Sequence, residues 1–443
     1  MGKYFGTDGF RGVANKNLKA SLAFKIGRFI GHSETNQPKK ILIARDTRLS
    51  GEMLNNAIAS GIMSSGGDVY DLGVSTTPSV SYLVIKHHFD YGVMISASHN
   101  PYYDNGIKIF NSNGEKLEEN IENEIEKYLD SFEDDIPFAL NENIGKRPDS
   151  KDLVNEYIDY LASKANFKFD NLKVLIDCSN GSASALIRSL LDKIHLKADL
   201  VNVSPNGINI NDRCGSTHIQ NLSDIVTSKH YDVAFAFDGD ADRLLMMDHK
   251  GHIVDGDAII FLNALFMKKN GKLHNNKVVL TVMSNIGLKK ALDKFDVGYS
   301  IVNVGDKYVQ ADMKKNNYSL GGEQSGHIIF LDDMNTGDGL LTMIRVLDVM
   351  ASEGKSIEEL VKDLVIYPQV LKNTIVTNKE AVLSHKGFLS HIKELEETLH
   401  GDGRILVRAS GTEPLIRVMC EASSLEICNK ICNDLIEYIS ELQ

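Results

Sequence analysis

Basic residues are in deficit in this sequence: 48 lysines and arginines stand against 60 aspartates and glutamates, which gives a formal net charge of -12. A surface that binds the phosphate backbone of nucleic acid needs an excess of positive charge, so nucleic acid is not expected as the main partner. A small phosphorylated ligand needs only a few local cations and oriented backbone amides. The composition therefore remains compatible with a small anionic substrate.

Cysteine and long apolar runs are also scarce. The five cysteines form no CxxC pair and no metal-binding spacing with histidine, which is typical of a reduced cytoplasmic protein. No signal-peptide pattern opens the sequence, and no apolar run approaches the length that spans a bilayer. We therefore expect a cytoplasmic protein with no membrane partner.

Three stretches of the chain begin alike, with a β-branched run, a polar turn and a helical pattern, and a second strand-like run follows each. They are "KKILIARDTRLSGEML" (39–54), "LKVLIDCSNGSASALI" (172–187) and "NKVVLTVMSNIGLKKAL" (276–292). Each closes on a third apolar run and a polar loop, in "YGVMISASHNP", "YDVAFAFDGDADR" and "YSLGGEQSGHIIF". The pattern predicts an α/β protein with three βαβαβ domains on mixed, largely parallel sheets.

The limits of these domains follow from changes in composition. A polar stretch, "NENIGKRPDSKDL", predicts a boundary near residue 149, and the tail carries two alternating strands and a final helix, which is typical of a smaller α+β domain. Ligands bind beyond the carboxyl ends of parallel strands, so the polar loops are expected to face one central cleft. The predicted domains cover residues 1–149, 150–250, 251–366 and 367–443.

Three aspartates follow the apolar run "VAFAF" at alternate positions of "DGDADR". On a helix such carboxylates would fan out, whereas in a loop they can converge on one point. Three hard oxygen donors suit Mg²⁺, so Asp238, Asp240 and Asp242 are candidate metal ligands. An EF-hand calcium loop is excluded, because Arg243 and His249 stand where it needs glycine and glutamate. A solvated acidic turn is the alternative.

The stretch "MISASHNPYYDNGIKIF" places a serine beside a histidine. Adjacent side chains on an extended segment point to opposite faces, so Ser98 and His99 are not expected to act as a base-activated pair. Phosphoryl transfer can use a serine without such a base, because the protein then supplies mainly positioning and charge. Lys108, and Arg11 in the glycine-rich "GTDGFRG", are candidate cations. The structural alternatives are a turn serine and a histidine that braces the loop.

Two further loops have the composition of ligand-binding turns. In "RASGTEPLIR", Arg408 can bind an anion with its bidentate fork, and Ser410 with the next two residues supplies amides and hydroxyls. A plain hairpin turn would suit the same residues. In "GGEQSGH", Glu323 and Ser325 offer acceptors for sugar hydroxyls or an ammonium group, with a structural glycine-rich turn as the alternative.

The motifs "GTDGFRG", "SASHNP", "DGDADR", "GGEQSGH" and "RASGTEP" occur in the order, and at roughly the spacing, of the α-D-phosphohexomutase family, which the sequence resembles over nearly its whole length. It is most similar to the bacterial branch that acts on glucosamine phosphates. The motifs that carry this similarity are "NGININD", "CGSTH", "TVMSN", "VGDKYV" and "GEQSGH". The resemblance implies an isomerase that interconverts glucosamine 6-phosphate and glucosamine 1-phosphate through a phosphoserine and a 1,6-bisphosphate. That reaction feeds UDP-N-acetylglucosamine and peptidoglycan synthesis.

The resemblance also implies roles for single residues. Ser98 would carry the phosphoryl group, and an oxygen of its phosphate would join the three aspartates in holding one Mg²⁺. The implied catalytic residues are Ser98, Lys108, Arg11 and His99. The implied substrate-binding residues are Glu323, Ser325, Arg243, Arg408, Ser410, Gly411, Thr412 and Arg417. Activation by glucosamine 1,6-bisphosphate or by autophosphorylation is expected, and a homodimer is compatible with the sequence.

Three alternatives stay open. A sibling mutase for glucose or mannose phosphates would share every catalytic residue, a non-catalytic phosphosugar-binding protein would keep the same cleft, and a metal-dependent phosphatase would discharge the phosphoserine to water. One position departs from the family, which commonly has proline where Ala409 stands. Proline fixes φ, so this phosphate loop is expected to be less rigid.

Overall fold

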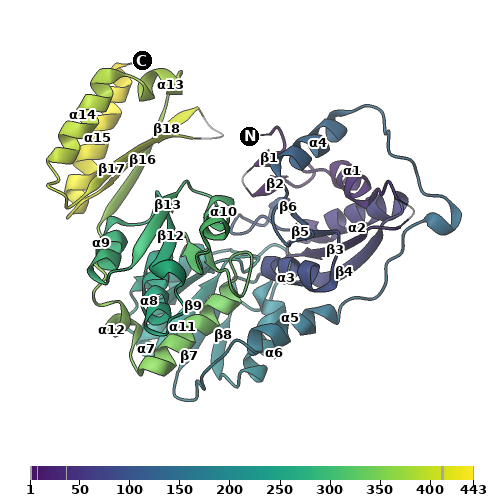
Figure 1. Cartoon of the computed structure of the whole chain (residues 1–443), viewed down its shortest axis with the longest axis horizontal. Helices are drawn as coiled ribbons and strands as arrows, with labels where there is room; N and C mark the ends of the chain where they lie inside the picture. The colour runs from purple at the N-terminus through teal and green to yellow at the C-terminus, as the bar shows by residue number, and fades with distance from the viewer. Residues whose placement is uncertain (1, 7, 36, 411–413, 443) are drawn as a thin grey trace. The chain divides into compact units, whose positions relative to one another are not determined.

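The computed structural model describes residues 2–6, 8–35, 37–410 and 414–442. The chain forms two compact units, Met1–Met283 with Val297–Val361 and Ser284–Asp296 with Lys362–Gln443. The first unit contains three mixed β-sheets with helices packed on them, and the second contains one small antiparallel sheet (Figure 1). None of the described helices is long and apolar enough to cross a membrane.

The three sheets of the first unit share one plan, in which the first parallel strand lies between the second and the third. The parallel strands are β3 (Lys40–Arg45), β4 (Asp68–Val74) and β5 (Tyr91–Ile95); β7 (Val174–Asp177), β8 (Ala198–Val201) and β9 (Val233–Phe237); and β12 (Lys277–Thr281), β13 (Gly298–Val302) and β14 (Leu320–Gly322). The predicted repetition of strand, helix and strand is confirmed. It follows from the buried β-branched runs, which need cover on both faces.

An antiparallel strand then returns from the third parallel strand of each sheet. These strands are β6 (Asp104–Asn111), β10 (Leu244–Asp248) and β15 (Ile328–Phe330). The polar loops singled out in the sequence are the connections of these hairpins, so all three lie at the carboxyl ends of parallel strands. Further antiparallel strands extend the first two sheets: β1 (Phe5–Gly6), β2 (Gly9–Val13) and β11 (Ile253–Val254).

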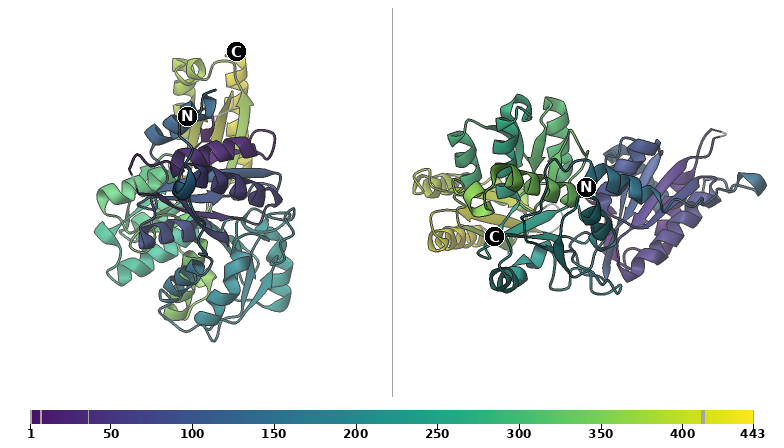
Figure 2. Two further views of the ribbon diagram at one scale, coloured as in Figure 1. Left: turned by 90° about the vertical axis from the view of Figure 1, so that its right-hand side faces the viewer. Right: turned by 90° about the horizontal axis from the view of Figure 1, so that it is seen from below.

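Crossover helices connect the parallel strands. In the first sheet, α2 (Leu49–Ser64) and α3 (Thr77–His87) lie on opposite faces, and the two further views show the same layering (Figures 1 and 2). Thr76 caps α3 by accepting a hydrogen bond from the N–H of Ser79, and a proline opens the helix. The other crossover helices are α6 (Ala183–Lys193), α7 (Ser223–Lys229), α9 (Ile286–Lys294) and α10 (Asp306–Asn316).

The remaining helices cover the sheets or join the domains. They are α1 (Ala20–Gly31), α4 (Glu119–Asp130), α5 (Leu153–Ala162), α8 (Gly256–Lys269), α11 (Gly339–Glu353) and α12 (Ile357–Val361), with 3₁₀ turns at Asn141–Asn143, Ser216–Leu222 and His274–Asn276. The acidic stretch 118–135 begins with α4. Its hydrophobic stripe buries Ile125, Tyr128 and Leu129, and the acidic face remains in solvent.

The second unit contains the antiparallel sheet β16-β18-β17, built from β16 (Gln369–Ile375), β17 (Arg404–Ala409) and β18 (Leu415–Glu421). Its helices are α9, α13 (Lys379–Leu383), α14 (Lys386–Glu397) and α15 (Leu425–Glu441). The two strands and final helix expected in the tail are β17, β18 and α15. Three of the chain's five free cysteines, Cys420, Cys428 and Cys432, pack in this unit's apolar core.

Helices α1 and α2 of the first unit approach each other closely through glycines. A Cβ atom at Gly61 would overlap the backbone oxygen of Phe24, and one at Gly27 would overlap that of Ile58. Gly51 lies in the same helix as Gly61, but a Cβ there would be 3.4 Å from the nearest atom, an ordinary contact. The two glycines of α2 therefore differ in how closely α1 packs against them.

We expect Gly61→Ala to lower the free energy of unfolding by about 1–3 kcal/mol, because the added methyl group forces the two helices apart. Gly51→Ala is the matched control and should leave stability unchanged or raise it by up to about 1 kcal/mol, since alanine is the better helix former. Urea unfolding of both variants measures the difference. Equal stabilities would contradict the close helix contact.

Candidate active site

Three hairpin loops of the first unit meet at one place. The hydroxyl of Ser98, after β5, donates to Oδ2 of Asp238, after β9, over 2.5 Å. The backbone N–H of Leu244 donates to the carbonyl of Gly326, in the loop after β14, over 3.0 Å. Residues from three separate sheets thus form one polar cluster, as their position at strand ends predicts.

Ser98 is fully buried and has a positive φ of 53°, which is rare for a residue with a side chain. The expectation that Ser98 and His99 point to opposite faces is wrong: the backbone is not extended here, and Ser98 Oγ lies 3.4 Å from His99 Nδ1. Burial, then the charges of Arg243 and Arg11, lower the pKa of His99 to about 4. Arg243 also donates to His99 Nδ1 over 3.3 Å, so the neutral ring braces the loop.

The carboxylates of Asp238, Asp240 and Asp242 converge as predicted. One oxygen from each lies within 4.8 Å of the others, and all three side chains are buried. A positive φ at Ala241 turns the loop back between them, and the carbonyl of Ala241 accepts a hydrogen bond from the N–H of Gly339 over 2.9 Å. An acidic turn in solvent, the alternative, is contradicted by this burial.

This carboxylate cluster fits a cation. In the described part of the chain, Oδ1 of Asp240 and Oδ1 of Asp242 are buried and accept no hydrogen bond. A buried carboxylate oxygen without a donor is costly, and a hard divalent ion is the partner that such oxygens accept best. Asp240 Oδ2 is already occupied, since it accepts from the hydroxyl of Thr77 over 2.5 Å and from Lys108 over 2.8 Å.

Lys108 is the buried cation of the site. Its ammonium lies 2.8 Å from Asp240, 3.1 Å from Asp242 and 3.4 Å from Asp8. Burial opposes the charge, but the three carboxylates raise the pKa of Lys108 well above its usual value. Burial and the neighbouring carboxylates raise the pKa of Asp238, whereas Lys108 leads the charges that hold the pKa of Asp242 low against burial. Lys108 therefore balances only part of the negative charge of the three clustered aspartates.

Asp8 is a member of the site that the sequence analysis did not identify, although it lies in "GTDGFRG". Its carboxylate binds Lys116 over 2.6 Å and also pairs with Arg11 and Lys108. Lys116 in turn pairs with Asp306 over 2.7 Å. Burial opposes ionisation, but Lys108, Lys116 and Arg11 hold the pKa of Asp8 well below its usual range. The carboxylate of Asp8 thus binds both Arg11 and Lys108.

The two predicted residues of the loop after β14, Glu323 and Ser325, have different surroundings. Glu323 Oε1 accepts a hydrogen bond from the N–H of Gly305 over 3.0 Å, at the start of α10. The hydroxyl of Ser325 is buried and has no hydrogen-bond partner among the described residues. His327, which the sequence analysis also missed, lies 3.8 Å from Asp242 and accepts from the N–H of Gly337 over 3.0 Å.

The predicted phosphate loop belongs to the second unit. Arg408 on β17 and Arg417 on β18 are directly paired across the two strands. Burial, then the charge of Arg417, lowers the pKa of Arg408. The carbonyl of Ser410 accepts from Lys379 over 2.8 Å. Like charges directly opposite each other are unfavourable, and an anion would relieve them. Gly411 and Thr412 lie outside the described residues.

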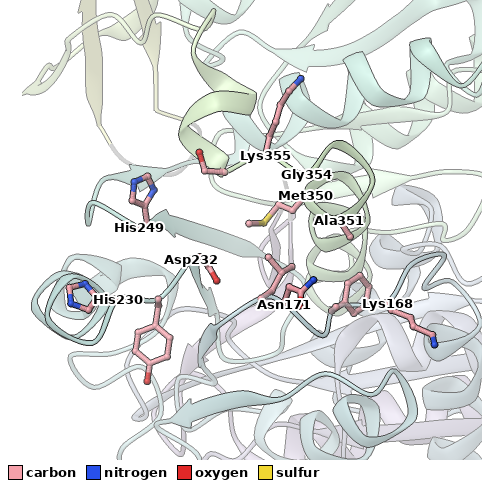
Figure 3. Close-up of a pocket in the computed structure, with 13 residues that line it drawn as sticks. Lys168, Asn171, His230, Asp232, His249, Met350, Ala351, Gly354 and Lys355 are labelled. Carbon is pink, nitrogen blue, oxygen red and sulfur yellow. The ribbon is translucent and has the colours of Figure 1, made fainter.

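A separate cavity of about 610 Å³ lies at the other end of the strands that carry the aspartates. Asp232 precedes β9 and His249 follows β10, and Met350 and Gly354 come from the last turn and end of α11 (Figure 3). Figure 3 shows the side chain of Lys355 extending away from the other labelled residues. None of the clustered carboxylates lines this cavity, so it is not the candidate active site.

Four domain profiles of one family match the chain in order. They are described as phosphoglucomutase/phosphomannomutase alpha/beta/alpha domain I (residues 2–135), domain II (155–251), domain III (255–367) and C-terminal domain (371–437). A relative in Lachnospira eligens named phosphoglucosamine mutase is 49% identical over 443 residues, covering 99% of this chain and 98% of the relative. Together these matches span nearly all of the sequence.

Two solved structures have the same fold. A phosphoglucomutase/phosphomannomutase family protein from Burkholderia thailandensis is 23% identical, covers 97% of this chain and 95% of its own, and superposes with a TM-score of 0.79. An N-acetylphosphoglucosamine mutase from Aspergillus fumigatus, described in complex with GlcNAc-6P and magnesium, is 18% identical, with coverages of 98% and 95% and a TM-score of 0.72. At these identities the likeness establishes the fold alone.

We expect Lys108→Met to destabilise the metal-free protein by about 3–5 kcal/mol, because it leaves the buried Asp240 and Asp242 without their shared cation. Mg²⁺ should then raise the melting temperature of the variant more than that of the parent. Thermal unfolding in EDTA and in Mg²⁺ measures both effects, with the exposed Lys250→Met as the control. Identical melting temperatures of Lys108→Met and the parent in EDTA would contradict the charge balance.

Proposed function

The chain belongs to the phosphoglucomutase/phosphomannomutase family, and from that premise we propose that it is an isomerase that interconverts glucosamine 6-phosphate and glucosamine 1-phosphate. Relatives named phosphoglucosamine mutase, 46–49% identical over 98–100% of this chain, support this substrate over glucose or mannose phosphates. The product leads to UDP-N-acetylglucosamine and peptidoglycan. A phosphosugar is the small-molecule partner.

The observation that carries the proposal is the contact of Ser98 Oγ with Asp238, 2.5 Å apart, inside a buried cluster of three carboxylates. No basic histidine activates this serine, since His99 is neutral and its Nδ1 accepts from Arg243. Phosphoryl transfer fits such a site, because positioning and charge supply most of its catalysis. A serine whose hydroxyl donates to a buried carboxylate and not to a basic histidine fits acyl transfer poorly.

The proposed reaction has two transfers, because C1 and O6 lie on opposite sides of the sugar ring. Phosphorylated Ser98 first gives its phosphoryl group to the free hydroxyl of the bound monophosphate: the Ser98 O–P bond breaks, a sugar O–P bond forms, the sugar hydroxyl loses a proton and Ser98 Oγ gains one. The 1,6-bisphosphate then turns around. Ser98 then takes the other phosphoryl group back: the second sugar O–P bond breaks, a Ser98 O–P bond forms, Ser98 Oγ loses its proton and the released sugar oxygen gains one.

The cations have distinct roles in this scheme. Lys108, which its carboxylates keep as an ammonium, is our candidate for stabilising the negative charge that develops on the oxygen that the phosphoryl group leaves. A phosphoserine carries about -1.5 to -2 charge at neutral pH. Arg11 and Arg243 offset part of that charge, and Arg243 also fixes His99. Local basic residues are therefore needed in a protein that is acidic as a whole.

The three aspartates are the residues that would hold Mg²⁺, since two of their oxygens are buried without a donor in the described chain. An oxygen of phosphorylated Ser98 would complete the donor set. Mg²⁺ bound there supplies charge neutralisation to the transferring phosphoryl group. The magnesium named in the description of the Aspergillus fumigatus structure supports this choice of ion.

We assign the sugar to the loop after β14, and the phosphate that does not react to the loop between β17 and β18. Ser325 has a buried hydroxyl with no partner in the described chain, and Glu323 offers carboxylate oxygens, so both suit the sugar's polar groups. Arg408 and Arg417, directly opposite each other, suit the phosphate that does not react. Ser410, Gly411 and Thr412 would complete that grip. Either end of the sugar must fit there in turn.

The finer parts of the proposal concern activation and organisation. Ser98 is primed by glucosamine 1,6-bisphosphate or by autophosphorylation, and the protein acts in the cytoplasm and forms a homodimer. The domains divide at residues 149, 250 and 366. A phosphatase is the second candidate function, and it would be favoured if water reached the phosphoserine.

We expect purified protein with Mg²⁺ to convert glucosamine 6-phosphate, and Ser98→Ala to lower turnover by on the order of 10³-fold or more, because the group that accepts the phosphoryl is lost. A coupled assay for glucosamine 1-phosphate measures this. Release of inorganic phosphate instead of glucosamine 1-phosphate would identify a phosphatase. Full activity of Ser98→Ala would exclude the phosphoserine mechanism.

We expect Arg408→Met to raise KM for the monophosphate by about 10- to 100-fold with a smaller effect on kcat, because it removes a charged contact to the phosphate that does not react. Lys372→Met is the control, since Lys372 lies in the same sheet, on the far strand β16, and donates to Asn433 on α15. Steady-state kinetics on both variants separate the outcomes. An unchanged KM for Arg408→Met would remove Arg408 from the substrate site.

A further inference from the structure

The backbone of Ser98 is held by side chains from two domains. Its N–H donates to Ser96 Oγ over 2.9 Å, and its carbonyl accepts from Arg48 over 2.8 Å and from Asn211 over 2.9 Å. Arg48 belongs to domain I, as Ser98 does, whereas Asn211 belongs to domain II. Both donors are buried. Ser98 has a positive φ, a conformation that persists when its surroundings fix it.

Arg48 serves the whole loop and not Ser98 alone. Its guanidinium also donates to the carbonyls of Asn100 over 2.8 Å and Asp104 over 3.0 Å, and it pairs with the buried Asp46 over 2.8 Å. Removing its side chain would take one donor from each of these carbonyls and leave the buried Asp46 without its charged partner, so the loop would lose its shape. Arg48 is therefore part of the folded framework of domain I.

Asn211 makes a smaller and more specific contact. Its amide nitrogen donates to the carbonyls of Ser98 over 2.9 Å and Asn100 over 3.0 Å, and to no other domain I residue for which a bond is described. The aspartate loop lies against the same point, because a Cβ at Gly239 would be 2.5 Å from Ser98 O and 3.0 Å from Asn211 Nδ2. Asn211 thus joins the serine to the loop that carries Asp238.

Holding domains I and II together does not require Asn211. The hydroxyl of Thr47 donates to the carbonyl of Asn180 over 2.6 Å, and the N–H of Leu49 donates to the carbonyl of Gly207 over 2.8 Å. These contacts join the same two domains without a bond to Ser98. The two hydrogen bonds of Asn211 are directed instead at the backbone of the serine and of Asn100.

We propose that Asn211 is a positioning residue for phosphoryl transfer, which holds the Ser98 backbone so that its oxygen stays in register with the aspartate loop. This inference rests on the proposed mutase function. Asn211 touches the backbone of the serine and not the sugar, so its loss should reduce kcat and leave KM unchanged. It gives a role to the "NGININD" segment, which no step of the proposed reaction uses.

The test compares Asn211→Ala, Asn211→Asp and the parent, each as the full chain with Mg²⁺. The aspartate has the same shape but cannot donate to the Ser98 carbonyl. Asn209→Ala is the matched control, because Asn209 lies in the same loop and bonds within it, to Ser204 and Asn206. We expect both Asn211 variants to lose about 10- to 100-fold in kcat with KM within about twofold, since small misplacements of a reacting group have effects of that size.

A second readout does not need turnover. Glucosamine 1,6-bisphosphate added to each dephosphorylated protein should phosphorylate Ser98, and intact mass follows the rate. We expect this rate to fall in the Asn211 variants and to stay at the parent value in Asn209→Ala, with all melting temperatures within a few degrees. Such a result supports positioning over a general loss of structure.

Four outcomes would overturn the proposal. If the parent is active and Asn211→Ala keeps its kcat and phosphorylation rate, Asn211 does not position Ser98, and the proposed function still stands. If Asn209→Ala loses as much kcat as Asn211→Ala, or if kcat falls only with a matching loss of melting temperature, the role is structural. If the parent itself converts no phosphosugar, the proposed function fails and this inference fails with it.

Discussion

The buried ammonium of Lys108 is the interaction on which the site depends. Asp240, Asp242 and Asp8 all lie within 3.4 Å of it, in a place largely closed to solvent. Without that charge, three carboxylates could not share so small a space, because the cost of burying unpaired charge is several kcal/mol per ion. Lys108 lies on β6, directly opposite Met94 of β5, so the hairpin that carries Ser98 also carries the cation that pairs with the aspartates.

The same strand order, repeated in three sheets, brings the other residues of the site close to Lys108. In each sheet the hairpin after the third parallel strand carries the polar residues, and the three hairpins converge. In the proposed reaction the first loop would supply a serine for the phosphoryl group, the second would supply carboxylates for a cation, and the third would supply a glutamate and a serine for the sugar. Close contacts such as Gly239 against Ser98 keep the loops in register, so a small backbone shift in one loop reaches the next.

The sequence predicted what depends on local pattern. Alternating strands, helix starts and the spacing of Asp238, Asp240 and Asp242 identify the repeated units and the carboxylate cluster, and the structure agrees with both. Asn211 was missed because both of its partners are distant in the chain, and Asp8 was missed because, apart from Arg11, its partners Lys108 and Lys116 are distant too; no local pattern reports such contacts. The wrong expectation for Ser98 and His99 has a different cause: an extended backbone was assumed where φ is positive.

The most direct test of the central claim is the fate of a labelled phosphoryl group. Protein incubated with Mg²⁺ and glucosamine 1,6-bisphosphate carrying label in both phosphates should be isolated, digested and mapped, then given unlabelled glucosamine 6-phosphate. The account predicts label on the peptide that contains Ser98, at that residue, and its later appearance in glucosamine 1,6-bisphosphate and the monophosphates. Label on another residue, or on none while the sugars still interconvert, would contradict it.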